Sequence, residues 1–306
     1  MFRTLIVPLD GSEQAECALP YAVRLAAPRG GRVVLVRAAL GPPPSGQDWE
    51  RQQTAAVDEA NVYLTDVARK LATRVPVATS VPYGHAAEQI LASVAQFDAD
   101  AIVMTTHGRT GLAHLMRGSV AEAVLAQAQV PVLLLHARPG ESVSPPFDLP
   151  SARMLVPLDG STLSEAAVPV AATMLGIAGE LVLLMVVEPP ERVHRDESGR
   201  VIAYVDQQEE TVRQTALDYL SGVAAAVKKD NPDLHVTSDV RVGTPTEGIL
   251  FAEVDRAADL VVMATHGRTG IDRVVRGSVA GEVVRDGHAP VLLVPPHAFA
   301  PHPASV

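Results

Sequence analysis

Short apolar runs alternate with longer amphipathic stretches along the chain, and this alternation occurs twice in the same order. The runs are rich in Val, Leu and Ile and predict buried β-strands, whereas the stretches between them repeat apolar residues with the period of an α-helix. In the stretch after the first strand, for example, Ala15, Leu19, Ala22 and Ala26 fall on one stripe. The predicted strands are 4–9, 33–38, 75–81, 101–106 and 131–136 in the first half, and 153–158, 181–187, 235–241, 260–265 and 290–294 in the second.

The alternation of strands and helices predicts the class of fold. Strands joined through helices form right-handed crossovers, and these build a parallel sheet that is covered on both faces. We therefore expect two Rossmann-like α/β domains, each with a five-stranded parallel sheet in the order 3-2-1-4-5.

The two halves share sequence as well as pattern. Leu5–Ser12 returns as Met154–Ser161, an offset of 149 residues (154 − 5) that grows to 159 (267 − 108) further along. The second copy therefore carries extra residues, which fall in Glu188–Asp206. The most distinctive recurrence follows each fourth strand: Thr106-His107-Gly108-Arg109-Thr110-Gly111 with Gly118-Ser119-Val120-Ala121, and Thr265-His266-Gly267-Arg268-Thr269-Gly270 with Gly277-Ser278-Val279-Ala280.

This duplication predicts the domain boundaries. We expect a first domain over 1–137, a linker rich in Pro and Ser over 138–151, a second domain over 152–296 and a tail over 297–306.

The repeated segments converge on the place where such a sheet binds ligands. In an open parallel sheet, ligands lie beyond the carboxyl ends of the strands where the strand order reverses, here between the first and fourth strands. Asp10-Gly11-Ser12 follows the first strand and the glycine-rich segment follows the fourth. Gly108 and Gly267 would let the backbone approach a phosphate, and a helix beginning at Ser119 or Ser278 would offer N–H groups to it.

Each of these residues also has a purely structural interpretation. Gly-Ser before a helix is ordinary capping, and Ser119 with Glu122 forms a capping box that the second copy lacks. Asp10 and Asp159 could accept a hydrogen bond from an adenine amino group or a ribose hydroxyl, or cap the next helix with Ser12 or Ser161. The two roles can coexist.

Composition narrows the function classes. A formal net charge of −10 argues against nucleic acid and anionic membranes as partners, and one cysteine fits a reducing compartment. The chain shows no secretory leader pattern and no membrane-spanning run, so we expect a cytoplasmic protein. His107 and His266 have no ligand-spaced neighbours, so no metal site is expected, and nothing nominates a nucleophile or general base. The P-loop motif is absent.

The glycine-rich segments resemble those of the universal stress protein family, whose ATP-binding members carry Gly, two residues, Gly, nine residues, then Gly-Ser or Gly-Thr. The last three elements match twice, and the similarity covers both halves nearly end to end. The chain thus looks like a tandem member, and the resemblance implies domains like those of adenine-nucleotide α-hydrolases. It also implies domains paired through their fifth strands, and with them a homodimer. The first glycine of the motif is replaced by Thr105 and Ala264, whose side chains would narrow the approach to a nucleotide, threonine more than alanine.

The resemblance implies an adenine site and a phosphate site in each half, with a methionine beside the nucleotide. The residues so implied are Pro8, Asp10, Ala38, Met104, Gly108, Gly118, Ser119 and Val120 in the first half, and Pro157, Asp159, Val186, Met263, Ala264, Gly267, Gly277, Ser278 and Val279 in the second.

The function expected from the resemblance is an ATP-binding universal stress protein that acts as a nucleotide-dependent sensor or regulator of the stress response, without efficient catalysis. Mg²⁺ could accompany the nucleotide, and the protein partners are not identified by the sequence. Two alternatives stay open: a slow ATP hydrolase or pyrophosphatase-like enzyme, and an interaction module that binds no nucleotide.

Overall fold

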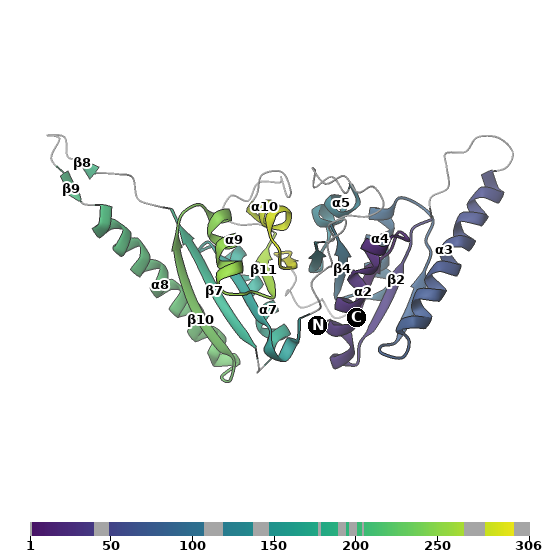
Figure 1. Ribbon diagram of the computed structural model, residues 1–306, viewed down its shortest axis with the longest axis horizontal. Helices are drawn as coiled ribbons and strands as arrows, with labels where there is room; N and C mark the ends of the chain where they lie inside the picture. The colour runs from purple at the N-terminus through teal and green to yellow at the C-terminus, as the bar shows by residue number, and fades with distance from the viewer. Residues whose placement is uncertain are drawn as a thin grey trace, which may run out of the picture. The chain divides into compact units, whose positions relative to one another are not determined.

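The chain divides into two compact units, and the boundary lies between Phe147 and Asp148. The computed structural model (Figure 1) describes residues 2–39, 49–106, 119–136, 147–176, 179–188, 194–195, 201–203, 205–265 and 279–296.

The first unit is built on a parallel sheet of five strands. Their order is β3-β2-β1-β4-β5, which confirms the predicted 3-2-1-4-5 arrangement. The strands are β1 (Thr4–Pro8), β2 (Arg32–Val36), β3 (Val77–Ser80), β4 (Ala101–Thr105) and β5 (Val132–Leu135).

Helices cover both faces of this sheet. The crossovers leading from β1 to β2 and from β2 to β3 run in one direction and the later ones in the other, so right-handed connections place their helices on opposite faces. The long helix α3 runs alongside β2 and β3 (Figure 1). The helices are α1 (Glu13–Glu16), α2 (Ala18–Ala26), α3 (Trp49–Leu71), α4 (Ala86–Phe97) and α5 (Ser119–Gln127), with a 3₁₀ turn at Ala27–Arg29.

The second unit repeats this plan in the strand order β10-β7-β6-β11-β12. An antiparallel pair, β8 (His194–Arg195) and β9 (Val201–Ala203), lies within the extra residues of the second copy. The other strands are β6 (Arg153–Leu158), β7 (Glu180–Val187), β10 (His235–Val242), β11 (Leu260–Ala264) and β12 (Val291–Val294). The helices are α6 (Thr162–Glu165), α7 (Ala167–Leu175), α8 (Val205–Asp230), α9 (Pro245–Asp255) and α10 (Val279–Asp286), with a 3₁₀ turn at Leu149–Ser151.

The helix after each first strand is divided in two, at Cys17 in the first unit and at Ala166 in the second. A proline follows three residues later in both copies, Pro20 and Pro169. Proline has no N–H to donate to the carbonyl four residues before it, so the ladder of hydrogen bonds is interrupted there. The repeated proline therefore explains the repeated break.

The cores consist of aliphatic side chains on the central strands. Every residue of β4 and of β11 is buried, as expected for strands covered on both faces. Within the described part of the chain, no helix combines the length and the apolar character needed to cross a bilayer.

Part of the segment expected to be a linker packs onto the units. Phe147 is buried and its ring meets Tyr21 edge-on, with the centroids 5.8 Å apart. Arg24 Nε donates a hydrogen bond of 3.3 Å to the Phe147 carbonyl, and Leu149 is buried as well. Residues 138–146 and the expected tail over 297–306 lie outside the described residues.

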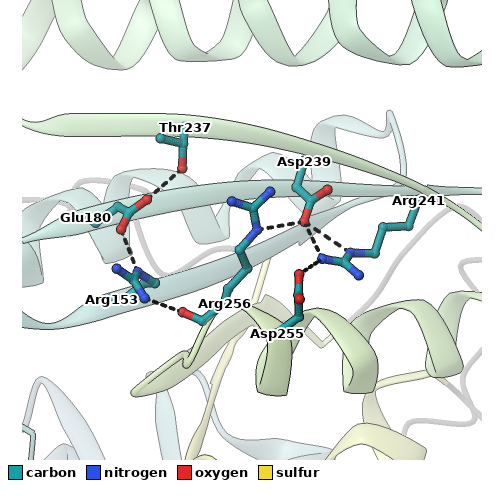
Figure 2. A network of polar contacts seen from close by, with 7 residues as sticks. All are labelled: Arg153, Glu180, Thr237, Asp239, Arg241, Asp255 and Arg256. Carbon is teal, nitrogen blue, oxygen red and sulfur yellow. Dashed lines mark hydrogen bonds and ion pairs between the residues drawn. The ribbon is translucent and has the colours of Figure 1, made fainter.

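The edge strand β10 carries a polar network that lies against α9 (Figure 2). Asp239 accepts hydrogen bonds from Arg241 (2.9 Å) and from Arg256 (3.0 Å), which ties the strand to the end of α9. Asp255 accepts a further bond from Arg241. Glu180, which accepts from Arg153 and Thr237, continues the network into β7. Inward-facing charges of this kind make an edge strand a poor template for pairing with another chain.

Candidate functional site

The sheet of the first unit is least tightly paired where its strand order reverses. β1 pairs with β2 at five positions, from Thr4 to Pro8. It pairs with β4 at only two, Leu5 and Ile6. The ladder between the two central strands therefore stops before their carboxyl ends, which is the position where open parallel sheets bind ligands.

Pro8 gives a physical reason for this early stop. The N–H of Leu9 donates to the Val36 carbonyl on the β2 side, at 2.8 Å. Because successive backbone groups of a strand point to opposite sides, the nitrogen of Pro8 faces β4, and it carries no hydrogen to donate. The proline thus prevents the ladder with β4 from continuing to the strand end.

The second unit has the same arrangement. β6 pairs with β7 at six positions but with β11 at two, Met154 and Leu155. Pro157 stands where Pro8 stands in the first copy (157 − 8 = 149, the offset of the repeat). Both sheets are therefore interrupted at the same point by the same residue type.

A tight turn follows each of these strands. Asp10 Oδ1 accepts hydrogen bonds from the N–H of Ser12 (2.9 Å) and from its hydroxyl (2.6 Å). Ser12 Oγ in turn accepts from the N–H of Ala15 and caps α1. Gly11 between them has φ +87°, a left-handed conformation that favours glycine.

The turn is repeated in detail in the second unit. Ser161 donates the same two bonds to Asp159 Oδ1, at 2.9 and 2.6 Å, and caps α6. Gly160 has φ +80°. In both units the serine caps the helix and the aspartate supports that serine, which fixes the direction of each carboxylate at the edge of the sheet.

A group of side chains that the sequence reasoning missed surrounds the first turn. Arg37, the residue after β2, has its guanidinium 3.5 to 3.7 Å from the position that a Cβ on Gly11 would occupy. The same guanidinium lies over the ring of Tyr63 (5.0 Å to the centroid) and forms an ion pair with Glu59 (3.0 Å). Tyr63 Oη donates a hydrogen bond of 2.9 Å to Glu16.

Only part of this group recurs in the second unit. Tyr219 Oη donates to Glu165 Oε1 at 2.8 Å, as Tyr63 does to Glu16. In both tyrosines burial is the main cause that raises the pKa above its ordinary value, and the hydrogen bond to a carboxylate adds to it. The recurrence of both residue types at matching places in the repeat was the signal that could have revealed this pair.

The structure brings the described part of each predicted site to one edge of its sheet. Pro8 ends β1, Asp10 and Ala38 lie just beyond β1 and β2, and all three are half-buried. Met104 is buried as the penultimate residue of β4, which Thr105 ends. In the second unit Pro157, Val186 and Met263 are the penultimate residues of β6, β7 and β11, Asp159 follows β6, and Ala264 ends β11.

The predicted phosphate loops fall largely outside the described residues. Val120 and Val279 lie in the first turns of α5 and α10 and are half-buried. The predicted residues that are not described are Gly108, Gly118, Gly267, Gly277, Ser278 and the side chain of Ser119.

Chemically, the described edge offers hydrogen-bonding groups, apolar walls and, in the first unit, one cation. No group of three or more His, Cys, Asp or Glu that could hold a metal ion occurs among the residues with described positions.

Comparison with known proteins places this geometry in a family. Residues 1–136 and 151–295 each match the model of the Universal stress protein family. The universal stress protein Rv2005c of Mycobacterium tuberculosis is 26% identical over 305 residues, which cover 94% of this chain and 96% of that protein. The universal stress protein MJ0531 of Methanocaldococcus jannaschii is 32% identical over 148 residues, which cover 46% of this chain and 81% of that protein.

A solved structure shows the same fold over the whole length. The crystal structure of a universal stress protein from Archaeoglobus fulgidus matches with a TM-score of 0.66 at 21% identity, over 96% of this chain and 97% of that one. Because the family model matches once in each half, the chain belongs to the universal stress protein family as a tandem member.

Proposed function

We propose that each unit binds an adenine nucleotide, ATP, at the carboxyl edge of its sheet, between β1 and β4 in the first unit and between β6 and β11 in the second. The observation that carries the proposal is the doubled geometry of this edge. In both units a proline coincides with the early end of the central ladder, an Asp-Gly-Ser turn follows, and the neighbouring strand leads into the repeated glycine-rich sequence.

The residues at this edge fit the parts of a nucleotide. The half-buried proline and the small residue after the second strand offer apolar walls to a base, and the oriented carboxylate can accept hydrogen bonds from a ribose or an amino group. The buried methionines would lie beside it. The residues proposed to hold the nucleotide are Pro8, Asp10, Ala38, Met104, Gly108, Gly118, Ser119 and Val120, and Pro157, Asp159, Val186, Met263, Ala264, Gly267, Gly277, Ser278 and Val279.

The proposed sites differ in the residue that ends the fourth strand. Thr105 and Ala264 occupy the same place and are equally buried, at 8% exposure. The branched side chain of threonine takes more room than the methyl group of alanine. We therefore expect the second site to bind ATP more tightly than the first.

Calorimetric titration of the full chain with ATP, ADP, cyclic AMP and adenosine tests the proposal. We expect binding by the unmodified chain, and loss of the tighter site in Gly267→Val. A thermal midpoint that rises with nucleotide concentration is the matching readout, because a ligand that binds only the folded state stabilises it by mass action. Absence of binding at millimolar nucleotide, with a midpoint that nucleotide does not change, would favour the interaction module instead.

In this proposal the nucleotide regulates the protein and is not efficiently turned over. Sustained hydrolysis of ATP with Mg²⁺ that is lost in Asp159→Asn and Ser278→Ala would replace the regulator with a slow hydrolase. We also propose that the chain forms a homodimer. Light scattering of the purified chain with and without ATP tests this, and a monomeric mass in both conditions would contradict it.

A further inference from the structure

Arg37 is the one positively charged side chain among the described residues of the first proposed site. It belongs neither to the site residues predicted from the sequence nor to those implied by the family. Its guanidinium approaches the Asp10-Gly11-Ser12 turn from the side of α3, with Nη1, Cζ and Nη2 at 3.5, 3.6 and 3.7 Å from the Cβ position of Gly11. Glycine at position 11 leaves this face of the turn open toward the cation.

The surroundings of Arg37 hold it in place and leave a small part of it exposed. The ring of Tyr63 supports the guanidinium, and the Tyr63 hydroxyl is itself bonded to Glu16. The side chain of Arg37 is 12% exposed, whereas that of its ion-pair partner Glu59 is 70% exposed. An ion pair with so exposed a partner is weak, since water screens it and the long side chain loses entropy. A ligand anion can therefore replace Glu59.

The second unit keeps the tyrosine and its hydrogen-bonded glutamate, but it has uncharged residues at the positions of Arg37 and Glu59. In the sheet, Pro8 pairs with Val36 and Pro157 pairs with Leu184. The residues that follow these two partners, Arg37 and Met185, therefore correspond. In the helices, Tyr63 corresponds to Tyr219 (219 − 63 = 156), and the same offset places Thr215 at Glu59. The buried Ala60 and Leu64 correspond to the buried Ala216 and Leu220, which supports this alignment.

We propose that Arg37 is a specificity-determining residue of the first site, which selects ligands by their negative charge, with Glu59 as an internal competitor for the same cation. The inference rests on the proposed function, because it assumes that the first site binds a nucleotide. A guanidinium forms strong paired hydrogen bonds with phosphate oxygens and offers donors only. The first site therefore discriminates a nucleotide from its nucleoside more strongly than the second site does.

Reciprocal substitutions in the full chain test this selection. The first site is isolated in a Gly267→Val background and titrated calorimetrically with ATP, AMP and adenosine at low and high salt. Arg37→Met should weaken ATP binding about tenfold and change adenosine binding less than twofold. Glu59→Gln should strengthen ATP binding, because it removes the competing carboxylate, and Arg37→Lys should retain part of the selectivity.

The second site provides the matched experiment. In a Gly108→Val background, Met185→Arg should strengthen ATP binding and increase its dependence on salt, with adenosine unchanged. Equal weakening of ATP and adenosine by Arg37→Met, or a loss of ATP affinity in Glu59→Gln, would mean that the pair only supports the fold and would overturn the inference. Absence of nucleotide binding in both backgrounds would instead refute the proposed function. Circular dichroism of each variant shows that it is folded.

Discussion

Tyr63 of α3 donates its hydroxyl hydrogen to Glu16 of α1 over 2.9 Å. The same bond joins Tyr219 of α8 to Glu165 of α6 over 2.8 Å. Each bond links a long helix to the short helix that begins at the Asp-Gly-Ser turn. The long helices are therefore anchored directly beside the proposed nucleotide sites, in both units and by the same pair of residue types.

These two tyrosines should titrate at a higher pH than an ordinary tyrosine. Their pKa is raised, first by burial and then by the neighbouring carboxylate, so the neutral phenol stabilises the folded state. This contribution is complete below the ordinary tyrosine pKa of about 10 and is lost as the pH rises through the folded value. Ultraviolet titration of the phenolates of the five tyrosines should show a late phase.

The late phase should lose amplitude in the double variant Tyr63→Phe/Tyr219→Phe, which should also lose about 1 kcal/mol of stability per hydrogen bond at neutral pH. Tyr83→Phe is the control, because Tyr83 is 44% exposed. It should change stability by less than about 0.5 kcal/mol. A late phase of undiminished amplitude after the double substitution would contradict the assignment.

The serine caps give a second prediction. Ser12→Ala and Ser161→Ala each remove the acceptor for one N–H at a helix start and the donor to the aspartate, and each should cost about 1 kcal/mol in denaturant unfolding. Ser221→Ala lies at an exposed position within α8 and should leave stability unchanged or slightly raised. Equal effects at all three serines would show that the caps do not contribute.

The fold could be predicted from the sequence because its signals are local. Buried parallel strands appear in a single sequence as short apolar runs, and amphipathic helices appear as apolar residues that recur with the helical period. Because the chain is a tandem repeat, each of these signals occurs twice. The split of the first helix was not predicted, although Pro20 and Pro169 signal it. The pair β8 and β9 was missed as well, because its strands are too short to show a period.

The site was predictable only in part, because its contacts depend on tertiary structure. The turn residues Asp10 and Ser12 were recognised, since both capping and ligand binding act through neighbouring residues. Arg37 and Tyr63 meet only after a crossover has brought α3 back over the sheet, and no spacing along the chain encodes that contact. Comparison of the two copies could have drawn attention to Tyr63, but not to Arg37, which the second copy replaces.

A buried carboxylate in the second unit allows a coupling measurement. Glu253 is 3% exposed, and its Oε1 accepts hydrogen bonds from the N–H groups of His288 (2.7 Å) and Ala289 (2.6 Å). A Cβ on Gly287 would lie 2.9 Å from Glu253 Oε2 and 2.6 Å from the Val283 carbonyl. Glu253→Val should therefore cost about 2 kcal/mol, because one buried and one partly buried N–H lose their acceptor.

The first unit has Val94 and Ala128 at the corresponding places (253 − 159 and 287 − 159). Gly287→Ala should accordingly be less costly in the Glu253→Val background than in the unmodified chain, by about 1 kcal/mol in a double-mutant cycle followed by urea unfolding. Strict additivity of the two substitutions would show that the glutamate and the glycine do not constrain each other.

The polar network on β10 should contribute more to the stability of the second unit than the exposed ion pair Asp66–Arg69 contributes to that of the first, although the N–O distances are similar. Asp239 is 11% exposed and holds both Arg241 and Arg256, at 2.9 and 3.0 Å. Asp239→Ala would leave two partly buried guanidinium groups without this carboxylate, so it should cost about 2 kcal/mol. Asp66 and Arg69 are 2.8 Å apart but 57% and 73% exposed, and Asp66→Ala should change stability by less than about 0.5 kcal/mol.

Hydrogen exchange followed by mass spectrometry separates this effect from general destabilisation. Because the network joins the edge strand to the end of α9, Asp239→Ala should increase exchange in peptides from 235–242 and 245–256 before it does so elsewhere in the second unit. Asp66→Ala should leave the exchange of α3 unchanged. Uniform loss of protection throughout the second unit would mean that the network supports the unit as a whole and does not specifically fasten its edge.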